Sequence, residues 1–179
     1  MARLIAFLRG INVGGKTTVS MAALRQIVDG LGYTDVRTHL QSGNVVFTSE
    51  EPPQAASRKL EGALERELGL PIRVVVRTRG ELADVVARDA LADVATDPAH
   101  YVVIFLSQPP DPERLASIDP STYEPDVFRA SGREIYVWFP NGMGRSRLMS
   151  VLSDKGLGVV ATARNWNTVT ALLRIADAS

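Results

Sequence analysis

A glycine-rich stretch near the N-terminus carries residues suited to holding an anion. Segment 9–17, Arg-Gly-Ile-Asn-Val-Gly-Gly-Lys-Thr, lies between an apolar run and a helical pattern. Backbone N–H groups in a loop that joins a strand to a helix can converge on an oxyanion. We therefore predict an anion-binding loop, and its contributing residues are Arg9, Gly10, Asn12, Gly14, Gly15 and Lys16.

The same stretch fits the phosphate-loop pattern G-x-x-x-x-G-K-[ST], through Gly10, Gly15, Lys16 and Thr17. In a working phosphate loop the lysine and the hydroxyl residue open the helix. Here Ser20 is the better N-cap, before Met21, and no acidic residue follows the apolar run 101–106 to hold Mg²⁺. The pattern therefore favours a glycine-rich turn over a nucleoside triphosphatase.

Two further polar segments could contribute to anion binding. Ser42 and Asn44 flank a glycine in a tight turn, and the C-terminal half supplies Arg145, Ser146, Arg164, Asn165, Trp166 and Asn167. Arginine beside a helix start suits a phosphate or a carboxylate, and a tryptophan can stack on a ring. The alternative is structural, because Asn and Ser commonly close turns or cap helices and a tryptophan at such a junction commonly packs.

Catalytic chemistry has little support in the sequence. His39 and His100 are the only histidines, and the absence of cysteine excludes disulfides, thiolate metal sites and cysteine nucleophiles. No spacing predicts a catalytic triad or a His-Glu-x-x-His zinc site. We expect no metal and no cofactor. Whether the chain is an enzyme stays open, with Ser146 between two arginines as a candidate for an activated hydroxyl.

The composition is that of an ordinary globular protein. The 179 residues are 45% apolar and carry 20 basic and 20 acidic side chains, so the bulk charge gives no reason to bind nucleic acid or an anionic membrane. No segment is long and apolar enough to span a bilayer, and the first residues lead into a strand instead of a signal peptide. We expect a cytoplasmic protein with no membrane partner, and leave a homo-oligomer open.

Apolar periodicity and turn residues predict the elements of the first half. They indicate strands over 3–9, 36–41, 44–48 and 72–77, and helices over 21–31 and 54–68, the second of which Gly69 ends. This β-α-β-β-α-β order is the split βαβ, or ferredoxin-like, unit. Thr78 and Glu81 then form a capping box for a short helix over 79–88.

The same order repeats in the second half. It comprises strand 101–106, a short helix to about 117, hairpin 127–130 and 134–139, helix 146–153, strand 159–162 and helix 167–178. We predict an α+β chain of two tandem ferredoxin-like subdomains with antiparallel sheets, 1–78 and 101–179, joined by 79–100. Because strands such as 135–138 are apolar on both faces, we expect the second face of each sheet to be covered by the other half, the linker or a partner.

Topology decides which polar segments meet. In a split βαβ unit the first and third strands are antiparallel neighbours, so the end of one lies beside the start of the other. We therefore expect 10–16 to lie against 42–44, and 140–146 to lie at the edge that holds 163–168. The result would be two sheet edges rich in loop N–H groups, asparagine and arginine.

Three separated stretches resemble a known family. Segments 8–15, 41–47 and 162–169 are similar to marker stretches of the bacterial domain of unknown function family 1697, and the resemblance extends over nearly the whole chain. It implies two α/β-plait subdomains and supplies no activity, substrate or catalytic residue. It also implies that Lys16 and Thr17 are incidental, because the positions after the glycine pair vary in this family.

Three functions follow as hypotheses. The preferred one is a cytoplasmic binding protein that holds a small anionic or nucleotide-like ligand at these loop edges. The second is a phosphoryl or acyl transferase or hydrolase that uses the edges as an oxyanion site, although the sequence displays no general base. The third is an interaction module that pairs through its sheets. RNA recognition by the sheet is disfavoured, because strand 44–47 has one aromatic residue and no flanking base.

Overall fold

A computed structural model describes residues 1–13, 15 and 17–178. The chain forms two compact units, of which unit 1 comprises Met1–Asp84 with Ala171–Ser179 and unit 2 comprises Val85–Thr170. The sequence pattern predicted subdomains over 1–78 and 101–179, joined by a linker over 79–100. The structure instead groups 85–100 with the second unit and the C-terminal segment with the first.

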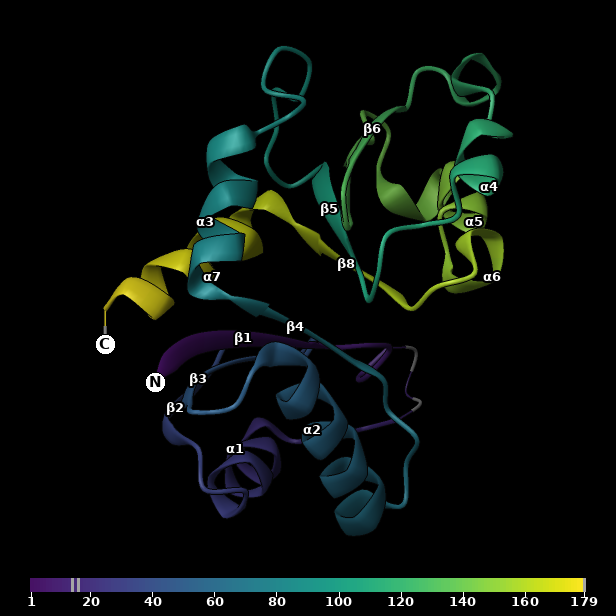
Figure 1. The fold of residues 1–179 in the computed structure, drawn as a ribbon. Helices are drawn as coiled ribbons and strands as arrows, with labels where there is room; N and C mark the ends of the chain where they lie inside the picture. The colour runs from purple at the N-terminus through teal and green to yellow at the C-terminus, as the bar shows by residue number, and fades with distance from the viewer. Residues whose placement is uncertain (14, 16, 179) are drawn as a thin grey trace. The chain divides into compact units, whose positions relative to one another are not determined.

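Unit 1 contains one four-stranded antiparallel sheet with two long helices on one of its faces (Figure 1). Its elements are β1 (Ala2–Leu8), α1 (Met21–Gly30), β2 (Thr34–Thr38), β3 (Asn44–Ser49), α2 (Pro53–Leu68) and β4 (Val74–Thr78). The strand order is β2-β3-β1-β4. In the register, Phe7 at the end of β1 pairs with Asn44 at the start of β3.

Unit 2 repeats this plan with shorter helices. Its elements are β5 (Tyr101–Leu106), α4 (Pro112–Ala116), η1 (Pro120–Tyr123), β6 (Val127–Ser131), β7 (Glu134–Trp138), η2 (Met143–Arg145), α5 (Leu148–Val151), α6 (Asp154–Leu157) and β8 (Ala161–Asn165). The order β6-β7-β5-β8 matches that of unit 1. Two four-stranded antiparallel sheets of the same order confirm the predicted α+β class and are consistent with two tandem ferredoxin-like units.

Two helices run across the division between the units. Helix α3 (Arg79–Arg88) begins in unit 1 and α7 (Trp166–Asp177) begins in unit 2. The capping box predicted for α3 is present, because Glu81 N donates to Thr78 Oγ1 at 3.0 Å and Thr78 N donates to Glu81 Oε1 at 3.1 Å. Asn165 caps α7 with a single hydrogen bond, in which Thr168 N donates to its Oδ1 at 2.9 Å.

Helix boundaries in unit 1 follow the predicted local chemistry. Ser20 Oγ accepts the Ala23 N–H at 3.0 Å and so caps α1. Gly69 ends α2 in the left-handed conformation, with φ 68°, and its N–H donates to Glu65 O at 2.8 Å. These two signals confirm that both helices are delimited by short-range interactions.

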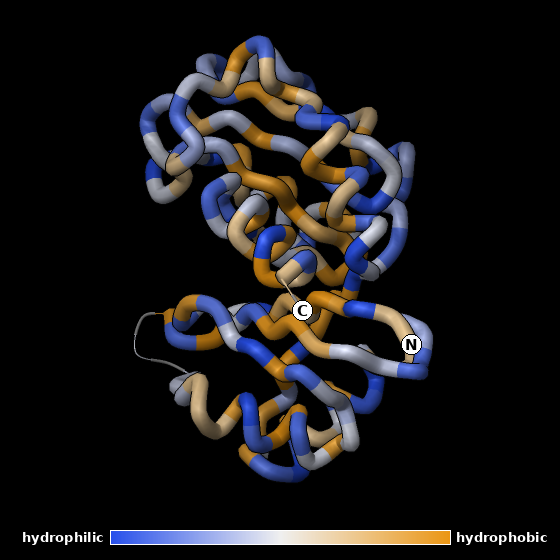
Figure 2. The backbone as a smooth tube through the Cα atoms, turned by 90° about the vertical axis from the view of Figure 1, so that its left-hand side faces the viewer, coloured by the Kyte–Doolittle hydropathy of each residue, from blue (hydrophilic) through white to orange (hydrophobic). Residues whose placement is uncertain are grey.

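Both sheets are buried on both faces, as the apolar strands predicted. In β1, Leu4 and Ala6 belong to the core under the helices, while Ile5 and Phe7 alternate with them and are also 0% exposed. Figure 2 shows long apolar runs in both units. In unit 2, the C-terminal part of α3 contacts the sheet, because Tyr136 Oη on β7 donates to Val85 O at 2.8 Å.

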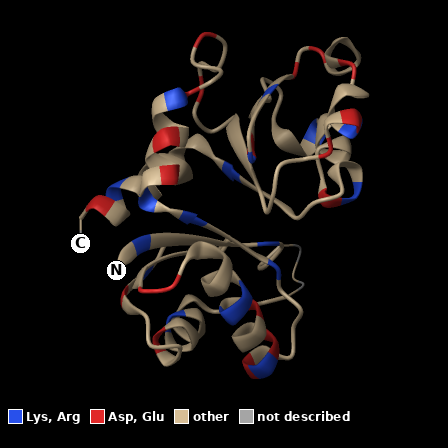
Figure 3. Ribbon diagram, viewed as in Figure 1, with Lys and Arg blue, Asp and Glu red and all other residues tan. Residues whose placement is uncertain are grey.

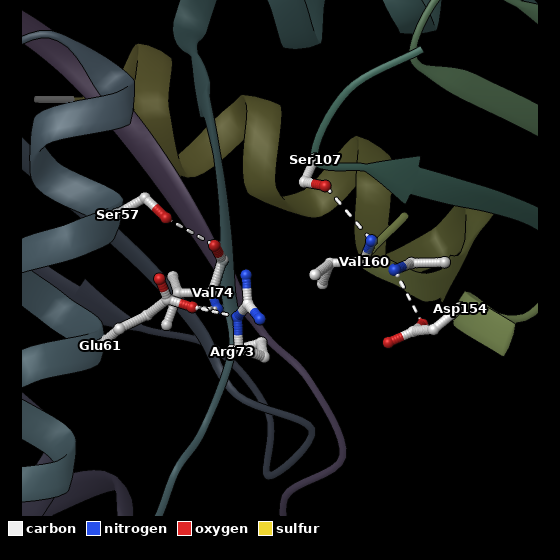
Figure 4. Close-up of polar contacts among 8 residues, drawn as sticks. Ser57, Glu61, Arg73, Val74, Ser107, Asp154 and Val160 are labelled. Carbon is white, nitrogen blue, oxygen red and sulfur yellow. Dashed lines mark hydrogen bonds and ion pairs between the residues drawn. The ribbon is translucent and has the colours of Figure 1, made fainter. Parts of the chain in front are cut away.

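A carboxylate on a helix accepts the first N–H of β4 in unit 1 and of β8 in unit 2 (Figure 4). In unit 1, Glu61 Oε2 on α2 accepts Val74 N at 3.2 Å and Arg73 Nε at 2.7 Å. In unit 2, Asp154 Oδ1 on α6 accepts Ala161 N at 2.9 Å. Val74 and Ala161 pair with the last residues of β1 and β5, so the two carboxylates perform equivalent tasks at equivalent places.

The predicted elements depart from the structure most clearly at three places. In unit 1, the strand expected over 36–41 is β2, which spans Thr34–Thr38. In unit 2, the helix expected over 146–153 is two short helices, α5 and α6. Ser153 begins the second by accepting the Gly156 N–H, and a Cβ at Gly156 would lie 2.2 Å from Val151 O, so the tight turn between the two helices requires a glycine there. The strand expected over 159–162 is β8, which extends to Asn165 because it pairs with β5 along its length.

Candidate functional site

The loop after β1 lies against the β2–β3 turn, as the topology predicted. Leu8 N donates to Gly43 O at 2.9 Å, and Asn12 Nδ2 donates to Gln41 O at 2.7 Å. This confirms the juxtaposition for the described part of 10–16. Gly14 and Lys16, two of the predicted ligand residues, lie outside the described residues.

Gly43 permits this close approach. Its φ is 90°, and a Cβ placed on it would lie 2.6 Å from Ile11 Cδ1 and 2.9 Å from Leu8 Cβ. Ile11 is 1% exposed and belongs to the core of unit 1. The turn and the loop are therefore joined by backbone bonds and by a buried apolar anchor.

The amide side chains predicted for this first edge make intramolecular hydrogen bonds. Asn12 Oδ1 accepts Val19 N at 2.8 Å, and its Nδ2 donates to Val19 O at 2.9 Å, which closes the loop before α1. Asn44 is fully buried, and its Nδ2 donates to His39 O at 2.7 Å and to Ser42 Oγ at 3.0 Å. These contacts match the structural alternative, in which such residues close turns.

Among the described residues, the rest of the first edge is exposed backbone and the side chain of Arg9. Arg9, Gly10 and Gly15 are exposed, and both glycines have positive φ, 68° and 74°. Thr17 also has positive φ, at 51°, and α1 begins only at Met21. The hydroxyl residue therefore does not open the helix as it does in a phosphate loop. Anion binding at this edge stays a prediction.

At the second edge, the predicted residues of β8 and α7 lie mostly in packing positions. Arg164 is 7% exposed inside β8, where its Nη1 donates to Thr162 Oγ1 at 2.7 Å and to Ala163 O at 2.8 Å. Burial lowers the pKa of its guanidinium to about 10. The loop position expected for it is therefore wrong, because the longer strand includes it.

Trp166 packs on an aromatic residue of its own unit. Its ring stacks on Tyr101 with centroids 4.6 Å apart and planes at 18°, and Tyr136 lies 6.5 Å away. Tyr101 Oη donates to Asp89 Oδ1 at 2.8 Å and accepts Leu91 N at 3.2 Å. Asn167 is exposed at the start of α7. The packing alternative therefore describes Trp166 better than a free stacking surface does.

Arg145 and Ser146 line a pocket of about 260 Å³ in unit 2. One wall comes from η1 and the turn after it, and the other from η2 and its neighbours. The lining residues are Tyr123, Glu124, Pro125, Asp126, Asn141, Gly142, Arg145, Ser146 and Arg147. The pocket thus places a hydroxyl, an amide and two guanidinium groups around a small open volume.

Hydrogen bonds join the two walls. Ser146 Oγ donates to Asp126 Oδ2 at 2.7 Å and accepts Leu148 N at 3.0 Å at the start of α5. Arg147 Nη2 donates to Thr122 O at 3.3 Å, and its guanidinium carbon lies 6.0 Å from the centre of the Tyr123 ring. These contacts link Ser146 and Arg147 to residues 122–126 on the other wall. Arg145 is exposed, and its side chain makes no hydrogen bond or ion pair with the described residues.

Three other features of the described residues bear on the function of the chain. They contain no group of three His, Asp or Glu side chains placed to hold a metal ion. The helices of the same part of the chain are too short or too polar to cross a membrane. Figure 3 shows Lys and Arg mixed with Asp and Glu along α2 and α3, which differs from the basic stripe of a nucleic-acid-binding surface.

Sequence reasoning found one wall of the pocket and missed the other. Arg145 and Ser146 were predicted as ligand residues, whereas the residues of 123–126 were not. A signal existed in Asp119 and Pro120, which mark a turn, because Asp119 Oδ1 caps η1 by accepting Ser121 N at 3.0 Å. Nothing in the spacing indicated that this turn would meet residues 141–147.

Comparison with known proteins places the chain in a family. A family model described as a protein of unknown function, DUF1697, matches residues 1–136, which include two of the three stretches that suggested it. The conserved bacterial protein SP0830 from Streptococcus pneumoniae has a similar structure, with a TM-score of 0.77 and 22% identity over 98% of each chain. At that identity the similarity shows the fold alone. Curated protein sequences give no match. The chain belongs to the DUF1697 family of proteins of unknown function.

Proposed function

We propose that this protein binds a small oxyanion-bearing ligand in the pocket between 123–126 and 141–147. The observation that carries the proposal is Arg145, an exposed guanidinium on the pocket wall whose side chain has no partner among the described residues. An arginine presents a planar set of donors that matches a phosphate or a carboxylate. Its position beside a pocket favours a ligand over a solvated surface charge.

Neighbouring donors would complete the recognition. Arg147 is held by Thr122 O, and several of its guanidinium N–H groups stay available after that single bond. Asn141 lines the same wall and adds an amide. Two charge-assisted hydrogen bonds, each contributing about 1.5–3 kcal/mol, correspond to a dissociation constant on the order of 1 mM for inorganic phosphate.

Titration calorimetry with inorganic phosphate and Arg145→Ala tests the proposal. The substitution should weaken phosphate binding about tenfold or more, because it removes the unpartnered cation. Arg58→Ala is the matched control, since Arg58 is an exposed arginine on α2 outside the pocket, and it changes the net charge equally. Equal phosphate affinity in the wild type and in Arg145→Ala would contradict the proposal.

A further inference from the structure

We propose that the ligand of this pocket carries a cationic group in addition to its oxyanion, so that it is dipolar or zwitterionic. This inference rests on the proposed function and adds the chemical class of the ligand. It follows from the way in which acidic and basic side chains divide between the two walls of the pocket.

The charges of the pocket are segregated by wall. The wall from 123–126 contributes Glu124 and Asp126 and no cation, while the wall from 141–147 contributes Arg145 and Arg147 and no acid. Arg145 therefore stands on the wall opposite the two carboxylates, while the Arg147 guanidinium reaches toward that wall and contacts Thr122 O and the Tyr123 ring. The formal charge of the lining is zero, although each wall is strongly charged.

These four charges form no ion pair with one another within the part of the chain that the structure describes. Ser146 Oγ satisfies only Asp126 Oδ2, and Asp126 Oδ1 accepts no hydrogen bond from the described residues. Glu124 is exposed and its carboxylate has no described partner. The acidic wall thus offers free acceptors to a donor inside the pocket.

A ligand with only negative charge would meet attraction from one wall and repulsion from the other. An ammonium group directed at Asp126 and Glu124 turns that repulsion into attraction, and it also satisfies the free Asp126 oxygen. A pocket of about 260 Å³ suits a compact molecule in which a few bonds separate the two charges. Phosphate or carboxylate with a nearby amine is therefore the class that fits both walls.

Calorimetry with three phosphates on the full chain tests the inference: inorganic phosphate, glycerol 3-phosphate and O-phosphoethanolamine. The last two are similar in size, and glycerol 3-phosphate carries the greater net negative charge. A simple anion site would bind glycerol 3-phosphate more tightly. The inference predicts that O-phosphoethanolamine binds about fivefold more tightly instead, because an exposed ion pair contributes at most about that factor.

The double variant Asp126→Asn, Glu124→Gln should abolish this preference. Asn retains an acceptor for Ser146 Oγ, so the wall keeps its hydrogen bond while losing its charge, and thermal unfolding verifies that the variant is folded. Glycerol 3-phosphate should then bind at least as tightly as O-phosphoethanolamine. Binding of O-phosphoethanolamine that depends on Arg145 and on both acids supports the inference, even where inorganic phosphate binds too weakly to measure.

Two results separate the failure of this inference from that of the proposed function. In the first, inorganic phosphate binds through Arg145 while O-phosphoethanolamine binds no more tightly than glycerol 3-phosphate. That result would refute the zwitterionic ligand class and leave the oxyanion site supported. If none of the three phosphates binds, or if Arg145→Ala leaves all affinities unchanged, both proposals are overturned.

Discussion

Gly43 is the residue on which the first loop edge depends most. Gly43→Ala should lower the free energy of unfolding by about 2–4 kcal/mol, because a Cβ would clash with Ile11 and Leu8 and the backbone has φ 90°. Gly32→Ala is a matched control in the same unit, with φ 87° and no atom within 4 Å of the added Cβ. It should cost about 1–2 kcal/mol from the backbone alone. Urea denaturation measures both, and equal losses would refute the packing argument.

Glu51 is one acidic residue whose titration should change stability at acid pH. Its carboxylate forms an ion pair with Lys59 and accepts Tyr33 Oη at 2.8 Å. The hydrogen bond from Lys59, and then that from Tyr33, lowers the pKa of Glu51 below its ordinary value. A folded-state pKa below the unfolded one stabilises the protein above the unfolded value, about 4.3, and this contribution is lost as the pH falls through the folded value.

Thermal unfolding of Glu51→Gln from pH 7 to pH 3 tests this linkage. The melting temperature of the variant should lie below that of the wild type at pH 7, and the difference should shrink toward pH 3. The exposed neighbour Glu50 provides the control, because Glu50→Gln removes the same charge without these bonds. A difference that stays constant with pH would show that the carboxylate charge is not the cause.

At the scale of elements, both units join a helix to an edge strand through a carboxylate, from Glu61 to β4 in unit 1 and from Asp154 to β8 in unit 2. Glu61→Ala would leave Val74 N without its acceptor and Arg73 without its partner. We expect a loss of about 1–2 kcal/mol, mainly from the backbone N–H, since the pair with Arg73 is largely solvated. Glu65→Ala on the exposed face of α2 controls for helix propensity. Urea midpoints that fall equally in both variants would contradict this role.

Local signals explain which elements the sequence could predict. Ser20 and Gly69 delimit helices through bonds to residues three or four positions away, so the pattern alone located these ends. The end of β8 depends on pairing with β5, in which Val102 pairs with Asn165, and such long-range register is invisible in the local pattern. The break between α5 and α6 likewise includes a close approach of Gly156 to Val151 O, which the sequence pattern did not indicate.

The same distinction applies to the candidate pocket. Arg145 and Ser146 were recognisable because residue type and a nearby helix start indicated an anion site. Asp126 was not, because it meets Ser146 only through the packing of two turns twenty positions apart. For Asn12 and Asn44, the sequence supported ligand binding and turn closure alike. Their hydrogen bonds could be assigned only when the atoms were placed.

The whole molecule consists of two units that share a strand order, yet unit 1 is discontinuous in sequence. The C-terminal segment from residue 171, which contains the end of α7, groups with 1–84 although 85–170 intervene. Within unit 1, Arg79 Nε contacts Asp177 Oδ1 at 2.6 Å, and Leu172 and Ala176 are 0% and 4% exposed. The C-terminal segment thus contributes an ion pair and buried side chains to unit 1.

Truncation after Thr170 should destabilise unit 1, although the removed residues are far from the rest of that unit in the sequence. Removing the buried Leu172 alone forfeits about 1.5–3 kcal/mol of apolar burial. We expect faster amide hydrogen exchange in β1 and β3, whose residues Ile5 and Val46 are fully buried in the intact chain. Truncation after Asp177 keeps the helix and should leave exchange in these strands unchanged. Faster exchange confined to β5 and β7 would instead assign the end of α7 to unit 2, because protection would then be lost only from the strands of that unit.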